Sequence, residues 1–176
     1  MFCFQCQETA RNQGCTMRGV CGKTGETADI QDLLVHVCMG IAFYGTRLKE
    51  IRPVDKKYGN LLCRSLFVTI TNASWDDNFI ISSIKAALES REELKRSFLA
   101  AWKEKNGKDF SEELPDCASW YSDDREEILA KSKSEELRIN KTSNEDVRSL
   151  QQLLVIGCKG IRSEEHTSEL QSPSVI

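Results

Sequence analysis

The most strongly patterned stretch of this 176-residue chain is Thr27-Ala-Asp-Ile-Gln-Asp-Leu-Leu-Val-His-Val-Cys-Met-Gly-Ile-Ala-Phe-Tyr44. Its apolar side chains fall at positions 30, 33, 34, 37, 38, 41 and 44 and continue at 48. This spacing is typical of an amphipathic helix that buries one face. Thr27 or Asp29 can act as its N-cap, so we predict a helix over residues 27–50.

Two further helices are predicted downstream. The apolar run from Leu61 to Ile70 suits a strand or a helix, and its helical neighbours favour a helix. Asp76 or Asp77 can cap a long amphipathic segment that continues to Asn106-Gly107. Residues 27–107 are therefore expected to form a three-helix bundle, and the fold class is mainly α.

The chain beyond this bundle is more polar. Residues 108–144 are predicted to form a charged connector on the surface, with a short helix from about Asp123 to Leu137. Thr142-x-x-Glu145 has the pattern of a capping box ahead of a helix over residues 145–161. That helix repeats the first one, because Gln31–Ile41 and Gln151–Ile161 share seven of eleven residues at an offset of 120. We interpret it as the start of a second, repeated helical bundle.

The last residues break this repeat. After Ile41 the first copy continues with apolar residues, whereas Ile161 is followed at once by Arg162-Ser-Glu-Glu-His-Thr-Ser-Glu-Leu-Gln-Ser172. That string resembles the in-frame translation of a short-read DNA-sequencing adapter. We therefore expect residues 162–176 to be foreign and exclude them from reasoning about the fold.

Cysteines dominate the N-terminus. Four of the eight lie in the first 21 residues as Cys3-x2-Cys6-x8-Cys15-x5-Cys21, within a glycine-rich segment over residues 1–26 that we call the cysteine loop. A Cys-x2-Cys pair with two more cysteines nearby can complete a tetrahedral set of thiolates. Lys23 adds a positive charge beside them.

The spacing leaves an iron–sulfur centre, a zinc site and no metal as alternatives. Structural zinc sites usually combine two short Cys-x-x-Cys knuckles, and only the first spacing here is that short, so an iron–sulfur centre is favoured. Cys38, Cys63 and Cys158 lie in apolar helical patterns and are interpreted as buried hydrophobic residues, whereas Cys117 is not assigned.

Composition excludes several classes of protein. The net charge is −3, with 24 basic against 27 acidic residues, so no nucleic-acid partner is expected. No apolar run approaches the ~20 residues that cross a membrane, and no signal-peptide pattern precedes Cys3. A cytoplasmic location is expected. His36 lies off the apolar stripe and is interpreted as solvated, so no catalytic residue is assigned.

Several motifs together resemble one known family, the hybrid-cluster proteins, also called prismane proteins or hydroxylamine reductases. The resemblance covers residues 1–161 and is carried by these segments: Met1-Phe-Cys-Phe-Gln-Cys-Gln-Glu-Thr-Ala10, Gly14-Cys-Thr16, Gly19-Val-Cys-Gly-Lys-Thr24, Asp29-Ile-Gln-Asp-Leu-Leu34, Phe67-Val-Thr-Ile-Thr-Asn72 and Val147–Ile161.

The resemblance implies that Cys3, Cys6, Cys15 and Cys21 bind a 4Fe-4S cluster, the type that goes with this compact spacing. It also implies reduction of hydroxylamine to ammonia and water, with nitric oxide as another substrate proposed for the family. The catalytic hybrid iron–sulfur–oxygen cluster is expected only in downstream domains, so this chain is expected to be an inactive N-terminal fragment that accepts electrons from a redox donor protein. The alternative is a stand-alone iron–sulfur carrier or an interaction module stabilised by zinc on the four cysteines.

Overall fold

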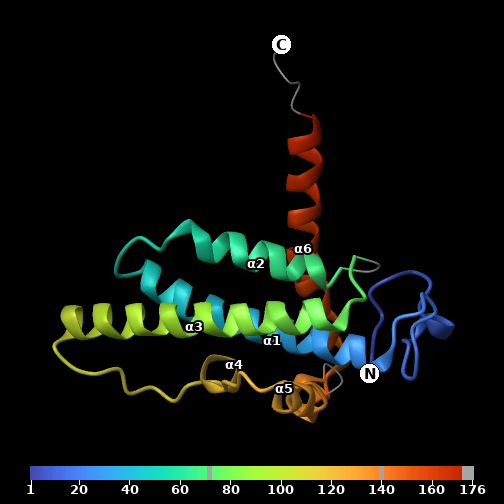
Figure 1. Ribbon diagram of the computed structural model, residues 1–176, viewed down its shortest axis with the longest axis horizontal. Helices are drawn as coiled ribbons and strands as arrows, with labels where there is room; N and C mark the ends of the chain where they lie inside the picture. The colour runs from blue at the N-terminus through green and yellow to red at the C-terminus, as the bar shows by residue number, and fades with distance from the viewer. Residues whose placement is uncertain (71–72, 139–140, 172–176) are drawn as a thin grey trace.

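The computed structural model describes residues 1–70, 73–138 and 141–171, with side chains described as far as residue 160. Within these residues the fold is mainly α, and in place of strands there is one isolated antiparallel bridge between Cys3 and Cys15. Three long helices lie across Figure 1, with the cysteine loop at one end of them. The predicted mainly-α class is confirmed.

The bundle consists of α1 (Gly25–Lys49), α2 (Lys56–Val68) and α3 (Asp77–Asn106). The ambiguous run from Leu61 to Ile70 is thus helical as far as Val68, and Asp76 caps α3 through the N–H groups of Asn78 and Phe79. α1 begins earlier than expected, because Thr24 supplies its cap by accepting a hydrogen bond from the Thr27 N–H at 3.0 Å. The predicted caps Thr27 and Asp29 are wrong, since both already lie inside the helix.

The core lies between α1 and α3. All the apolar positions predicted on the first helix are buried, and they pack against the inner face of α3. The largest fully buried apolar side chains are Tyr44, Phe98, Ile30, Leu33, Leu34, Ile41, Ile80, Ile84, Leu88, Leu94 and Ile128. This burial supplies the main stabilisation of the bundle, at roughly 1.5–3 kcal/mol for each large side chain.

The connector is more closely integrated than its charge suggests. It contains α4 (Asp116–Ser119), α5 (Arg125–Ser132) and the 3-10 turn Glu135–Leu137. Ala118 and Ile128 are fully buried against the bundle. The buried guanidinium of Arg91 donates to the Cys117 carbonyl at 2.9 Å, and the Tyr44 hydroxyl donates to the Ala118 carbonyl at 2.9 Å. Polar bonds to its backbone therefore hold α4 against α1 and α3.

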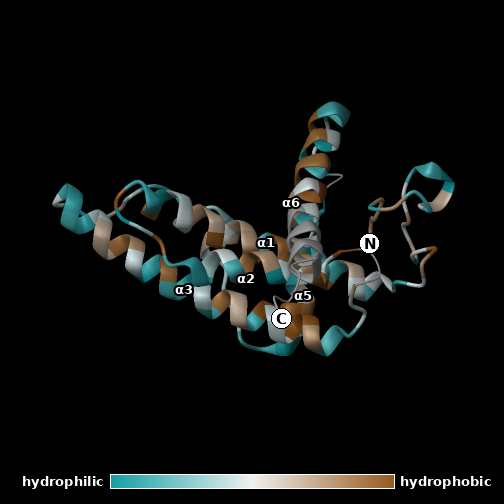
Figure 2. Ribbon diagram, turned by 90° about the horizontal axis from the view of Figure 1, so that it is seen from above, coloured by the Kyte–Doolittle hydropathy of each residue, from teal (hydrophilic) through white to brown (hydrophobic). Residues whose placement is uncertain are grey.

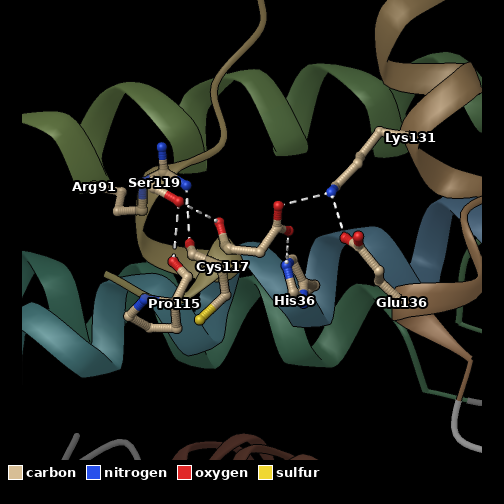
Figure 3. A network of polar contacts seen from close by, with 8 residues as sticks. His36, Arg91, Pro115, Cys117, Ser119, Lys131 and Glu136 are labelled. Atoms are coloured by element: carbon tan, nitrogen blue, oxygen red, sulfur yellow. Dashed lines mark hydrogen bonds and ion pairs between the residues drawn. The ribbon is translucent and has the colours of Figure 1, made fainter. Parts of the chain in front are cut away.

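His36 takes part in this attachment. Its Nε2 lies 2.8 Å from Asp116 Oδ2, and the other oxygen of Asp116 accepts from Lys131 Nζ at 2.8 Å (Figure 3). Lys131 also contacts Glu136 at 2.9 Å. The interpretation of His36 as a solvated side chain is wrong, because α4 covers this part of α1.

The His36 contact predicts a pH effect. Burial lowers the pKa of His36, and the hydrogen bond to Asp116 only partly opposes this. The folded state therefore favours the neutral imidazole. The contribution of His36 to folding stability is complete above the ordinary histidine pKa of about 6.5, and it declines as the pH falls below that value. We expect His36→Asn to lose less thermal stability than the wild type between about pH 7.5 and pH 5. Equal losses in the two proteins, measured by thermal melts, would contradict this assignment.

The last helix, α6 (Glu145–Gln171), has a different direction from the bundle. It stands almost upright in Figure 1 and packs against α2. Asn144 caps it by accepting from the Val147 N–H at 3.0 Å, whereas the Thr142 hydroxyl donates to Gln151. The predicted capping box is wrong because Thr142 lies two residues before the cap. The helix continues past residue 161 to Gln171, and residues 172–176 of the expected foreign tail lie outside the described residues.

The two repeated helices have opposite environments. Leu33 and Leu34 in α1 are 0% exposed, but their counterparts Leu153 and Leu154 in α6 are 66% and 69% exposed. Hydrophobic residues are visible along α6 where it extends beyond the bundle (Figure 2). Leu150 is exposed on the same face. The repeated segment thus gives α1 and α6 the same apolar stripe. The stripe is buried in α1, whereas the described residues leave it exposed in α6.

This exposed stripe is expected to promote self-association. Replacing Leu153 and Leu154 together by Gln should raise the concentration at which the chain stays monodisperse, because it removes contiguous apolar surface. Size-exclusion chromatography with light scattering over a concentration series measures the effect, and circular dichroism verifies that helicity is kept. Identical concentration dependence in variant and wild type would show that this face does not drive association.

Candidate metal centre

The cysteine loop is shaped by backbone hydrogen bonds. Cys3 and Cys15 form a two-residue bridge, in which each N–H donates to the other carbonyl at 3.0 and 2.8 Å. A second turn closes between Gly19 and Lys23, where the Gly19 N–H donates to the Lys23 carbonyl at 2.8 Å. Gly22 in this turn has a φ of +93°, a conformation that residues with a Cβ rarely adopt. Glycine is therefore required next to Cys21.

Cys15 lies at the centre of the loop. It is buried, and its Sγ accepts from the Ala10 N–H at 3.5 Å and lies 3.8 Å from the Thr9 hydroxyl. These contacts lower the pKa of the Cys15 thiol, chiefly through the backbone N–H of Ala10 and then that of Val20, and they outweigh the effect of burial. The loop thus stabilises a thiolate at this position, which is the form that binds metals.

The structure brings some of the predicted ligands together but not all. The backbones of Cys3 and Cys15 are hydrogen-bonded to each other, while Cys6 and Cys21 lie in the adjoining turns of the same loop. In the described part of the chain, no three Cys, His, Asp or Glu side chains converge closely enough to hold a metal ion. In donor type the loop still fits an iron–sulfur centre, because its four thiols are free and N–H groups point at the Cys15 sulfur.

Polar side chains anchor the cysteine loop to the start of α1. The Lys23 ammonium is buried and donates to Gln31 Oε1 at 2.7 Å, and Gln31 in turn donates to the Ser74 carbonyl at 3.0 Å. The N-terminal amine of Met1 lies 3.2 Å from Asp29 Oδ1. The same carboxylate accepts two hydrogen bonds from Arg138, at 2.5 and 3.3 Å.

Lys159 of α6 reaches the same region from the other side. Its buried ammonium donates to Gln5 Oε1 at 3.2 Å and to the Thr69 carbonyl at 3.4 Å. Burial lowers the pKa of Lys159 to about 8 and raises that of nearby Asp32 to about 7, while each charge partly opposes the shift of the other. Sequence reasoning missed Lys159, although one signal was present: it stands in the repeat where the first copy carries Met39.

A family model, the Prismane/CO dehydrogenase family, matches residues 1–174. The chain belongs to this family. Its similarity to individual family members is also high. It is 53% identical over 161 residues to the hydroxylamine reductase of Desulfosudis oleivorans, covering 92% of this chain and 28% of that protein. The hydroxylamine reductases of Halothermothrix orenii and Nitratidesulfovibrio vulgaris are 49% and 50% identical, each over 97% of this chain and 31% or 30% of their own length.

The chain therefore spans about 30% of the length of these family relatives. Proteins of the family bind iron–sulfur clusters, which agrees with the donor set of the cysteine loop. In the part of the chain that the structure describes, no helix is both long enough and apolar enough to cross a membrane.

The remaining cysteines are not part of the loop. Cys38 is buried, as predicted, and burial raises the pKa of its thiol to about 12. Cys117, which lies in α4, is also buried. The prediction is wrong for Cys158, which is exposed, and Cys63 is only half-buried, because the apolar faces of α6 and α2 are incompletely covered.

Proposed function

We propose that this chain is the N-terminal electron-relay part of a hydroxylamine reductase, with one 4Fe-4S cluster held by Cys3, Cys6, Cys15 and Cys21. The single observation that carries the proposal is this set of four free thiols on one glycine-rich loop, in a chain whose relatives are named hydroxylamine reductases. The compact spacing supports the 4Fe-4S type over a 2Fe-2S centre. An abundance of free thiols suits the reducing cytoplasm.

Such a cluster supplies one-electron transfer when bound. The residues of the chain have separate tasks around it. The cysteines hold the metal as thiolates, the Ala10 N–H stabilises the sulfur of Cys15, and the bridge between Cys3 and Cys15 fixes the loop. The anchoring of the loop to α1 through Asp29 and Gln31 keeps its position on the bundle.

The complete protein is proposed to reduce hydroxylamine with two electrons and two protons to ammonia and water, and nitric oxide is the other candidate substrate. We assign the hybrid iron–sulfur–oxygen cluster that performs this step to the portion of the relatives that this chain does not cover. Electrons come from a redox donor protein. No residue of this chain is proposed as catalytic, and neither nucleic acid nor a membrane is proposed as a partner.

Metal analysis of the whole chain tests the proposal. After anaerobic reconstitution with iron and sulfide, we expect about four iron atoms and about four acid-labile sulfides per chain. With a reduced dye as donor, we expect no hydroxylamine turnover. If the chain instead bound one zinc and no sulfide, the electron-relay proposal would be overturned and the zinc-stabilised module would take its place. Turnover by this chain alone would overturn the assignment of the active site to downstream domains.

The origin of residues 162–176 is a separate proposal. Their resemblance to an adapter translation supports a foreign segment, whereas the family match extends to residue 174. Re-amplifying the source DNA and sequencing across the codon for Ile161 decides between these alternatives. We expect the natural frame to continue with codons that do not encode this tail.

A further inference from the structure

Two buried ammonium groups beside the cysteine loop have neutral partners. Lys23 is 3% exposed and donates to the side-chain oxygen of Gln31, and Lys159 is 6% exposed and donates to Gln5 and to the Thr69 carbonyl. Among the described residues, no carboxylate lies within ion-pair distance of either ammonium. A buried charge without a close counter-charge is strongly unfavourable, so such a pair of lysines requires an explanation.

The other charged groups near Lys23 and Lys159 do not balance these two ammonium groups. Asp29 is already shared by the Met1 amine and Arg138. Asp32 acts on Lys159 only at longer range, and burial favours the neutral form of its carboxyl group. The buried layer between the cysteine loop, α1, α2 and α6 therefore carries more positive than negative charge.

We propose that Lys159, together with Lys23, supplies the counter-charge for an anionic thiolate-bound cluster in the cysteine loop and thereby raises its reduction potential. This inference rests on the proposed function, because it assigns the negative charge to that cluster. The inference goes beyond the proposed function because it makes Lys159 part of the cluster's environment. Lys159 lies in α6, 138 positions after Cys21 in the sequence. The hydrogen bond from Lys159 to Gln5, the neighbour of Cys6, holds the ammonium beside the cysteine loop, and its charge acts on the cluster from there.

The physical reason is the change in charge on reduction. Each added electron makes the cluster more negative, so a fixed positive charge nearby favours the reduced state. A unit charge at roughly 10 Å, with an effective dielectric constant of about 20, changes a one-electron equilibrium about tenfold. For a one-electron couple, a tenfold change corresponds to about 59 mV.

Three variants of the full chain test the proposal. Lys159→Met removes the charge and keeps the length of the stem, and Lys159→Arg restores the charge. Lys56→Met is the matched control, because Lys56 is exposed at the opposite end of α2 from Thr69. After anaerobic reconstitution, iron content and the midpoint potential are measured by an EPR-monitored redox titration. The thermal melting of the metal-free proteins is measured in parallel.

We expect Lys159→Met to keep its iron, to lower the reduced-to-oxidised ratio at a fixed potential about tenfold, and to melt in the metal-free form no earlier than the wild type. Lys159→Arg and Lys56→Met should keep the wild-type potential. An unchanged potential in Lys159→Met, or a lower melting temperature of its metal-free form, would leave Lys159 a purely structural role and overturn the inference. Absence of iron from the wild type would instead overturn the proposed function.

Discussion

Replacing Cys15 by Ser is expected to abolish stable binding of the cluster. Cys15 is the most deeply buried of the four loop cysteines, and its sulfur is already oriented by the Ala10 N–H and the Thr9 hydroxyl. A serine hydroxyl binds iron far less readily than a thiolate and keeps its proton at neutral pH. We expect less than about a tenth of the wild-type iron after desalting, and loss of the visible absorption of the cluster.

The same substitution at Cys3, Cys6 and Cys21 is expected to lower iron content as well. Cys158→Ser is the matched control, because Cys158 is exposed on α6 and no role in binding is assigned to it. Cys63→Ser, at a half-buried site on α2, should affect packing alone. Iron that remains at the wild-type level in all four loop variants would overturn the ligand assignment.

Replacing Gly40 by Ala is expected to destabilise the fold, although alanine favours helices. A Cβ at Gly40 would overlap the backbone carbonyl of Cys117 and approach the Arg91 side chain at 2.8 Å. The carbonyl cannot move aside easily, because Arg91 holds it by a hydrogen bond. We expect the free energy of unfolding to fall by about 1–3 kcal/mol, as for other overpacked sites.

Gly45 provides a control in the same helix. A Cβ there would meet Leu94 at 3.8 Å, an ordinary van der Waals contact. Gly45→Ala should therefore raise the free energy of unfolding by up to about 1 kcal/mol, through helix propensity alone. Urea titrations of both variants measure the difference. A Gly40→Ala protein that is as stable as Gly45→Ala would show that α4 does not approach α1 closely in solution.

Local patterns accounted for the helices of the bundle. The apolar spacing from Ile30 to Leu48 predicted α1 and its buried face. Of the two predicted caps of α3, Asp76 is confirmed and Asp77 already lies inside the helix, whereas Gly107 correctly marked its end. These features are recoverable from sequence because caps and amphipathic faces depend on residues within a few positions of each other. The cysteine spacing likewise identified the loop, and the four-ligand assignment stays a prediction.

Long-range contacts could not be predicted in the same way. His36 looked solvated because nothing nearby in the chain indicated that Asp116 covers it. Cys158 looked buried because the repeat copies the stripe of α1, and the two helices differ in what packs against them. Burial is a property of neighbours that arrive from elsewhere in the chain, so identical segments can have opposite environments.

The sequence by itself determined the helical class, the limits of the bundle within a few residues, and the clustering of four cysteines on one glycine-rich loop. Only the tertiary structure decided that α4 packs against Gly40, that α6 runs across the bundle, and that Lys159 lies beside the cysteine loop. The reason is that local hydrogen bonding and hydrophobic period fix secondary structure, whereas the surroundings of a charge depend on how whole helices pack.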